Sequence, residues 1–181
     1  KIELRWNAFA PFALRQNTFL TIVNDYPDDV CVQWYFINGD DAAAAVFSGP
    51  TLMERAHPGW NSVDCLNCLT PNESTYYSAG TGNPMGCQPF GILDPGSPPG
   101  RPDPVNPAQR VLRGYAIAFA VDSKDGCEIS WNHLSGHADI VDYANRSAWE
   151  YNAYAFQCVA SSTVGALCGT DPGTLHIDGV E

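Results

Sequence analysis

The sequence predicts an all-β protein, an immunoglobulin-like antiparallel β-sandwich with a long Pro- and Gly-rich loop insertion and disulfide bonds. Short stretches of alternating β-branched and aromatic residues recur, with turn signals between them at intervals of about 8–12 residues. No helical pattern of about 10–15 residues separates these stretches, which disfavours a parallel α/β sheet. The chain holds 16 glycines and 14 prolines in 181 residues, a composition typical of loop-rich β proteins.

The first strand signals lie at residues 17–24 and 30–38. Both stretches are rich in β-branched and aromatic residues that alternate along the chain, as strands with one buried face do. The turn between them, at 25–29, contains a proline and three aspartates, which reverse the chain. These features predict an antiparallel hairpin. The second strand is expected to bury one apolar face, made of Val30, Val32, Trp34 and Phe36.

Strand signals return in the second half of the chain at 111–122. A Ser-Lys-Asp-Gly turn then leads into a predicted strand at 127–134, so this pair is expected to form another hairpin. Ser135 and Gly136 are expected to end that strand, because glycine weakens strand interiors. Further strands are predicted at 137–142 and 147–158. Three tryptophans on apolar strand faces are expected in the core: Trp34, Trp131 and Trp149.

The chain divides into an N-terminal extended arm at 1–16 and a single sandwich domain at 17–181. A loop-rich insertion is expected at about 40–110, where the strand pattern weakens except at 74–79. Residues 83–107 hold 8 of the 14 prolines. Because proline lacks the amide that a sheet ladder needs, this segment is expected to be an extended surface loop.

Cysteine content indicates an exported protein, either secreted or at the cell surface. Two or three disulfides are expected in an oxidising compartment, and the odd count leaves one thiol free or paired with another chain. A reduced protein with buried cysteines is the alternative. The seven disulfide candidates are Cys31, Cys65, Cys68, Cys87, Cys127, Cys158 and Cys168. Cys65 and Cys68 form a CxxC without a second pair at zinc-site spacing, so a structural disulfide in a loop is the expected role.

Net charge limits the partners. The chain carries 20 acidic and 9 basic residues, a formal net charge of −11. Nucleic acid is excluded, because phosphate binding needs clustered lysine and arginine. No apolar run reaches the roughly 20 residues of a membrane helix. Other protein chains, including copies of this one, and glycans remain as partners.

Three blocks of the second half resemble a group of exported bacterial proteins. They are GYAIAFAVD at 114–122, ISWNHLSGHA at 129–138 and WEYNAYAF at 149–156. The opening stretch at 17–39 is also similar to that group. The resemblance implies an extracellular, β-rich surface domain. The group has no assigned activity, so the resemblance transfers no catalytic residue.

No cofactor is predicted, and the metal candidates are weak. His133, His137 and Asp139 lie close in sequence, but residues i and i+4 of a strand are about 13 Å apart, too far to share one zinc ion. Acidic turns at 25–29, 38–41 and 122–125 are candidates for structural Ca²⁺, although none fits the 12-residue EF-hand loop.

Paired carboxylates are the other candidate chemistry. Glu128 with Glu150 and Asp122 with Asp139 are such pairs, which glycoside hydrolases use. In an acidic chain they arise often by chance, and no nucleophile elbow or phosphate loop is present. No catalytic residue is therefore predicted.

The leading hypothesis is a non-enzymatic extracellular interaction protein, a subunit of a cell-surface assembly or fibre. An apolar arm can complete a neighbour's sheet by strand addition; the alternative is that the arm packs on its own domain. The arm residues are Ile2, Leu4, Trp6, Phe9, Phe12 and Leu14. The second hypothesis is a carbohydrate-binding module with aromatic candidates Trp6, Trp60, Tyr76 and Tyr77. The third is a metal-dependent hydrolase around His133, His137 and Asp139.

Overall fold

The computed structural model confirms the all-β, antiparallel class. Every regular element among the described residues is a strand, and this part of the chain contains no helix. Within it, therefore, no helix has the length and apolarity to cross a membrane. The immunoglobulin-like arrangement stays a prediction. The structure describes residues 1–7, 10–39, 46–54, 62–82, 101–103, 105–106, 108–124, 126–129 and 131–154.

The strands follow one another along the chain with short connections in most places. Most belong to one large sheet, whereas β4 and β5 pair only with each other. Their bounds are β1 Ile2–Asn7, β2 Ala10–Asn24, β3 Val30–Asn38, β4 Val46–Ser48, β5 Thr51–Glu54, β6 Ser62–Leu69, β7 Ser74–Ser78, β8 Arg101–Pro102, β9 Gln109–Val121, β10 Leu134–Asp142 and β11 Ser147–Asn152.

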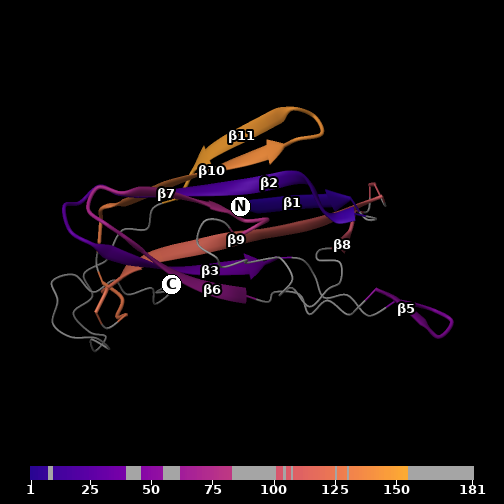
Figure 1. Ribbon diagram of the computed structural model, residues 1–181, viewed down its shortest axis with the longest axis horizontal. Coiled ribbons are helices and arrows are strands. Elements are labelled where there is room, and N and C mark those ends of the chain that lie inside the picture. The colour runs from indigo at the N-terminus through magenta and orange to yellow at the C-terminus, as the bar shows by residue number, and fades with distance from the viewer. Residues whose placement is uncertain are drawn as a thin grey trace, which may run out of the picture.

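The large sheet folds over on itself into two layers. Its strand order is β11-β10-β2-β1-β9-β3-β6, with β7 paired to β2 and β8 paired to β9. Figure 1 shows β2, β7 and β10 in one layer and β3, β6 and β9 in the other. Strand β1 joins the layers, because it pairs with β2 on one side and with β9 on the other. The sandwich is therefore closed on one side by backbone hydrogen bonds.

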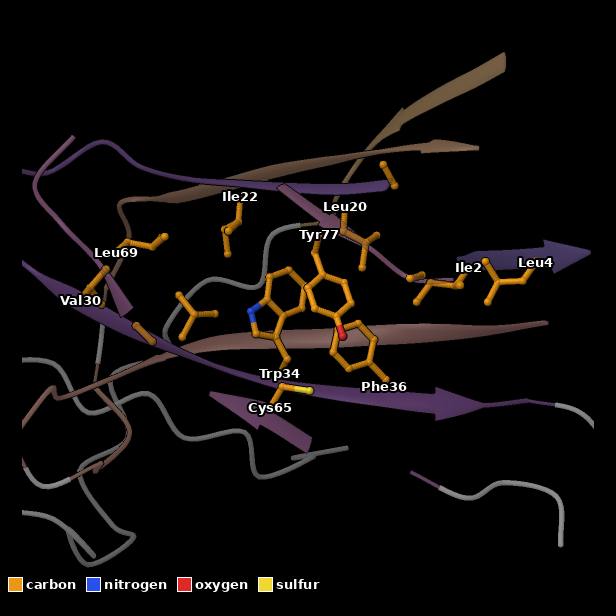
Figure 2. Close-up of a cluster of buried hydrophobic side chains, with 14 of the residues drawn as sticks. Ile2, Leu4, Leu20, Ile22, Val30, Trp34, Phe36, Cys65, Leu69 and Tyr77 are labelled. Carbon is orange, nitrogen blue, oxygen red and sulfur yellow. The ribbon is translucent and has the colours of Figure 1, made fainter. Parts of the chain in front are cut away.

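The core lies between the layers and is built around three stacked aromatic rings. The Phe36 ring lies 5.6 Å from that of Trp34 and 5.0 Å from that of Tyr77, centroid to centroid. Aliphatic side chains of both layers surround this stack (Figure 2). Alternation in β3 therefore predicts its core face correctly: Val30, Val32, Trp34 and Phe36 are all buried.

The predicted hairpin of 17–24 with 30–38 is wrong, although both strands exist. Strand β2 pairs with β1, β7 and β10, whereas β3 pairs with β6 and β9. The turn between them crosses from one layer to the other. The amide of the Asn24 side chain holds this crossing, because it donates to the carbonyls of Asp28 and Thr70 at 2.8 and 3.2 Å. Each strand thereby turns its apolar face to the other across the core instead of sharing a ladder.

The predicted strand at 127–134 and its end at Gly136 are also wrong. Among the described residues that follow β9, the pairing between the two segments is an isolated bridge between Val121 and Glu128, flanked by a hydrogen bond from the Ile129 amide to the Ala120 carbonyl. Strand β10 then runs through Gly136, where an added Cβ would lie 2.8 Å from the carbonyl oxygen of Thr21. The close approach of β2 leaves no room for a side chain at this position. Glycine in a strand interior often marks such a close approach of another backbone.

The predicted loop-rich insertion contributes to the main sheet. Strand β6 extends the β3 edge and β7 extends the layer of β2. The CxxC therefore lies in a strand and not in a loop. Residues 83–100, with most of the proline-rich segment, lie outside the described residues.

The described residues of the 1–16 segment pair and pack within their own domain. Strand β1 is paired on both sides, and Ile2 and Leu4 are completely buried in the core. Position 16 falls in the middle of β2, which begins at Ala10. The sequence leaves two alternatives open for this segment, strand addition to a neighbouring chain and packing on its own domain. The described residues have the second arrangement. Leu14 is half-buried, and the side chains of Trp6, Phe9 and Phe12 lie outside the described residues.

Candidate functional site

Three potential metal ligands converge on the outer face of β10 and β11. His137 and Asp139 are two residues apart on β10, so they share a face. Glu150 lies directly opposite Asp139 on β11. One ligand atom from each of the three lies within 4.8 Å of the other two. His137 Nε2 and Asp139 Oδ2 are 3.6 Å apart.

The hydrogen-bond pattern of the two strands explains this proximity. The amide of Ala153 donates to the carbonyl of Gly136 at 2.8 Å, which makes that pair a hydrogen-bonded one. Pair types alternate along an antiparallel ladder, so Asp139 and Glu150 form a non-hydrogen-bonded pair. Side chains approach most closely in such pairs.

Alternation also keeps the three side chains accessible. Ala138 and Ile140 of β10 are buried on the core side, so His137 and Asp139 lie on the other face, each with 36% of its side chain exposed. Glu150 is exposed. Solvent and ions therefore reach the cluster.

Of the three metal candidates that the sequence gives, the structure places two in the cluster and one outside it. His133 does not belong to the cluster: its Nδ1 lies 3.0 Å from Asp25 Oδ1, and its ring packs 4.3 Å from that of Tyr26. His137 and Asp139 are brought together. Glu150 was not among the metal candidates, because its position opposite Asp139 depends on the strand register, which residue spacing does not reveal.

In the described part of the chain, the acidic turns proposed for Ca²⁺ bring no three carboxylate, imidazole or thiol groups together. The Asp122 carboxylate instead accepts a hydrogen bond from the backbone amide of Lys124 at 2.6 Å, within its own turn. A similar role belongs to Asp142, which accepts the amides of Ala144 and Asn145. The hydrogen bond from the Asn145 amide is the main reason why the pKa of Asp142 is lowered. Residues 40, 41 and 125 lie outside the described residues.

A polar groove of about 550 Å³ lies where β1, β2, β10 and β11 meet. Ligand pockets in proteins commonly have this volume. Trp149 lines the groove and is 52% exposed, so the expectation that it is a core residue is wrong. Charged and polar side chains also line the groove, among them Glu3, Arg5, Arg15 and Asn145.

The two arginines of the groove differ in their partners. Arg5 is neutralised, because it forms ion pairs with Glu3 and Asp103 and donates to Gln16. Burial raises the pKa of Asp103, but hydrogen bonds from the Val105 amide and from Arg5 outweigh it and lower the pKa overall. By contrast, the Nε of Arg15 is buried without a hydrogen-bond partner.

The disulfide candidates divide between confirmed bonds and residues outside the described part. Cys31 on β3 and Cys68 on β6 lie directly opposite each other and are bonded. Cys65 and Cys127 are disulfide-bonded as well. Residues three apart on a strand point to opposite faces, which separates Cys65 from Cys68. Cys87, Cys158 and Cys168 lie outside the described residues.

The aromatic candidates for glycan binding also divide. Tyr76 is 54% exposed, whereas its neighbour Tyr77 is only 1% exposed and belongs to the core. Tyr77 is therefore wrong as a binding residue. Trp60 and the side chain of Trp6 lie outside the described residues.

The main path of the sheet ends at β11 on one side and at β6 on the other, and β7 and β8 each pair with one strand of this path. Strand β11 pairs with β10 along one side, and among the described residues no strand pairs with its other side. Because the Ala153 amide donates to Gly136 of β10, the amides of every second residue of β11 face β10. Those of Ala148, Glu150 and Asn152 therefore point away from β10. Figure 1 shows β11 rising away from the two layers.

Comparison with protein-family models, with curated proteins and with solved structures finds no match to this chain. The resemblance to exported bacterial proteins therefore stays a prediction. A β-sandwich by itself indicates no activity, because the same architecture serves many unrelated functions. What the protein does has to be inferred from the cluster, the groove and the outer strand.

Proposed function

We propose that the protein is a non-enzymatic, extracellular interaction domain whose copies assemble by β-strand addition at β11. The observation that carries the proposal is the outer edge of this strand. Its outward amides and carbonyls form the template that an added strand needs.

Two features of β11 indicate that its outer edge binds a partner strand and is not blocked against one. Natural proteins commonly block exposed edges with proline, lysine or a covering element. The sequence of β11, SAWEYN, contains neither proline nor lysine. Trp149 is exposed on it, and tryptophan is enriched in protein interfaces. An edge with these properties suits a partner that adds a strand and covers the indole.

The disulfides support the extracellular part of the proposal. The bond between Cys31 and Cys68 joins the edge strand β6 to β3, and Cys65 and Cys127 are also oxidised in disulfides. Such bonds persist in oxidising compartments and are rare in the cytosol.

The geometry of the sheet limits the possible assemblies. If β11 pairs with β11 of a second copy, a two-fold symmetric dimer closes. If β11 pairs with the opposite edge, β6, of the next copy, the contact repeats and builds an open filament. Both would extend the sheet from one copy into the next.

Sedimentation velocity and negative-stain electron microscopy over a range of concentrations test this proposal. The blocking variant is Ala148→Pro, which removes an outward amide and leaves every bond to β10 in place. Ala148→Ser keeps the amide and is the control. Dimers or filaments are expected for the wild type and the control, and monomers for Ala148→Pro. A wild type that stays monomeric throughout would overturn the proposal.

A second candidate function is the binding of an acidic carbohydrate in the groove. Two observations favour it: the exposed indole of Trp149 offers a flat apolar face, and Arg15 has a buried donor without a partner. Leaving such a donor unpaired costs stability, which an anionic ligand would recover.

Titration calorimetry with oligogalacturonate, and with a neutral oligosaccharide for comparison, tests this second function. Binding of the acidic sugar alone is expected, with a loss of at least tenfold in Arg15→Gln. Tyr76→Ala, which removes an exposed tyrosine outside the groove, is the matched control and is expected to bind as the wild type does. Equal binding of both sugars, or of neither, would contradict it.

A further inference from the structure

We propose that His137, Asp139 and Glu150 bind a Zn²⁺ ion that links the outer strand β11 to β10. The site goes beyond the interaction function proposed above and does not depend on it. Its ligands come from two strands that the register places side by side, with His137 and Asp139 on β10 and Glu150 on β11.

The distances suit a small tetrahedral ion. Zinc binds imidazole nitrogen at about 2.0–2.1 Å and carboxylate oxygen at about 2.0–2.2 Å, so neighbouring ligand atoms lie about 3.3 Å apart. His137 Nε2 and Asp139 Oδ2 are already 3.6 Å apart. The Glu150 oxygen lies within 4.8 Å of both ligand atoms. A small rotation of this exposed side chain closes the remaining gap.

The charges of the cluster call for a cation. Asp139 and Glu150 are like charges directly opposite each other, an arrangement that destabilises a sheet. In the described part of the chain neither forms an ion pair with a lysine or arginine, and the one charged contact is that of Asp139 with His137. A divalent ion would replace this repulsion with two attractive contacts.

The donor set selects the class of metal. Ca²⁺ and Mg²⁺ prefer sites made of oxygen ligands alone. An imidazole nitrogen beside two carboxylates suits zinc and similar first-row ions. Three protein ligands leave one tetrahedral position open, which water fills in an isolated chain.

The neighbouring histidine provides a matched control. His133 lies four residues before His137, is similarly exposed, and makes its contacts with Asp25 and Tyr26 instead. A variant at His133 therefore loses an imidazole of the same segment without touching the cluster.

Isothermal titration of the untagged, chelator-treated full chain with Zn²⁺ tests the proposal. One ion per chain is expected for the wild type, with binding at least tenfold weaker in His137→Asn and in Glu150→Gln, and unchanged in His133→Asn. Ca²⁺ is expected to bind at least tenfold more weakly than Zn²⁺. Circular dichroism confirms that each variant is folded.

Nuclear magnetic resonance of the imidazole nitrogens provides a second readout that does not depend on affinity. Zinc is expected to shift the Nε2 signal of His137 and to leave that of His133 in place. Absence of saturable Zn²⁺ binding, equal loss in His133→Asn, or equal affinity for Ca²⁺ would each overturn the proposal.

Discussion

Replacing Leu4 by alanine tests whether β1 is part of the fold of its own chain. Leu4 is 0% exposed and lies in the core beside Ile2 (Figure 2). Leu66 on β6 is 57% exposed and provides the same substitution at an outward-facing strand position. The pair separates the effect of burial from that of changing a leucine to an alanine in a strand.

The expected magnitudes follow from the exposed fractions. Leucine to alanine removes three carbons, worth about 2.4 kcal/mol when they are fully buried. The cavity left behind raises the loss at Leu4 to about 3–5 kcal/mol. Leu66 has less than half of its surface buried, so its loss is about 1 kcal/mol. For a chain of this length, each kcal/mol lowers Tm by about 2–4 °C.

Urea unfolding followed by tryptophan fluorescence measures both values, with the disulfides intact and at a concentration where sedimentation shows monomers. A difference of at least about 2 kcal/mol between the two variants is expected. If the free energies of unfolding of Leu4→Ala and Leu66→Ala fall within about 0.5 kcal/mol of each other, β1 does not pack in the core, and the closed sandwich is wrong.

Three further predictions concern a carboxylate, a buried hydroxyl and a disulfide bond. The pKa of Asp103 is lowered in the folded state, so its contribution is present above about pH 4 and is lost as the pH falls through the lowered pKa. Asp103→Asn should therefore be less stable at pH 7 and should lose less stability than the wild type between pH 4 and 2 in acid unfolding; identical curves would contradict this. The Tyr77 hydroxyl is buried without a partner, and burial raises its pKa. Tyr77→Phe should thus unfold at an equal or higher urea concentration, and a loss of more than about 1 kcal/mol would reveal a missed hydrogen bond. Removing both Cys31 and Cys68 should cost about 2–4 kcal/mol of stability, since their bond closes a loop of sequence separation 37. An unchanged Tm in calorimetry would show that the remaining disulfides already restrain this loop.

Local patterns predicted the strands but not their partners. The alternation at 17–24 and 30–38 identifies two strands and the core face of the second, because neighbouring side chains of a strand point to opposite sides. The same residues do not show whether the turn between them makes a hairpin or crosses between layers. That choice depends on Asn24 and on Thr70, which is distant in sequence.

Size of the side chains is also a poor guide to the buried face. On β9 the large residues Tyr115, Ile117 and Phe119 are exposed or half-buried, whereas Ala120 is buried. On the core face, Ala120 of β9 lies beside Val32 and Ala116 beside Phe36, so small residues of β9 accompany larger core residues of β3. Trp149 is a further case of the same kind, a large residue on an apolar pattern that the structure exposes.

The sequence by itself determined the all-β class, the abundance of disulfide candidates and the net negative charge, because composition and period-2 alternation do not depend on which strands pair. Only the tertiary structure decided that Glu150 joins His137 and Asp139, that Cys31 bonds Cys68, and that β1 closes the sandwich. These contacts join residues brought together by strand register and layer assignment, which arise from the packing of the whole chain.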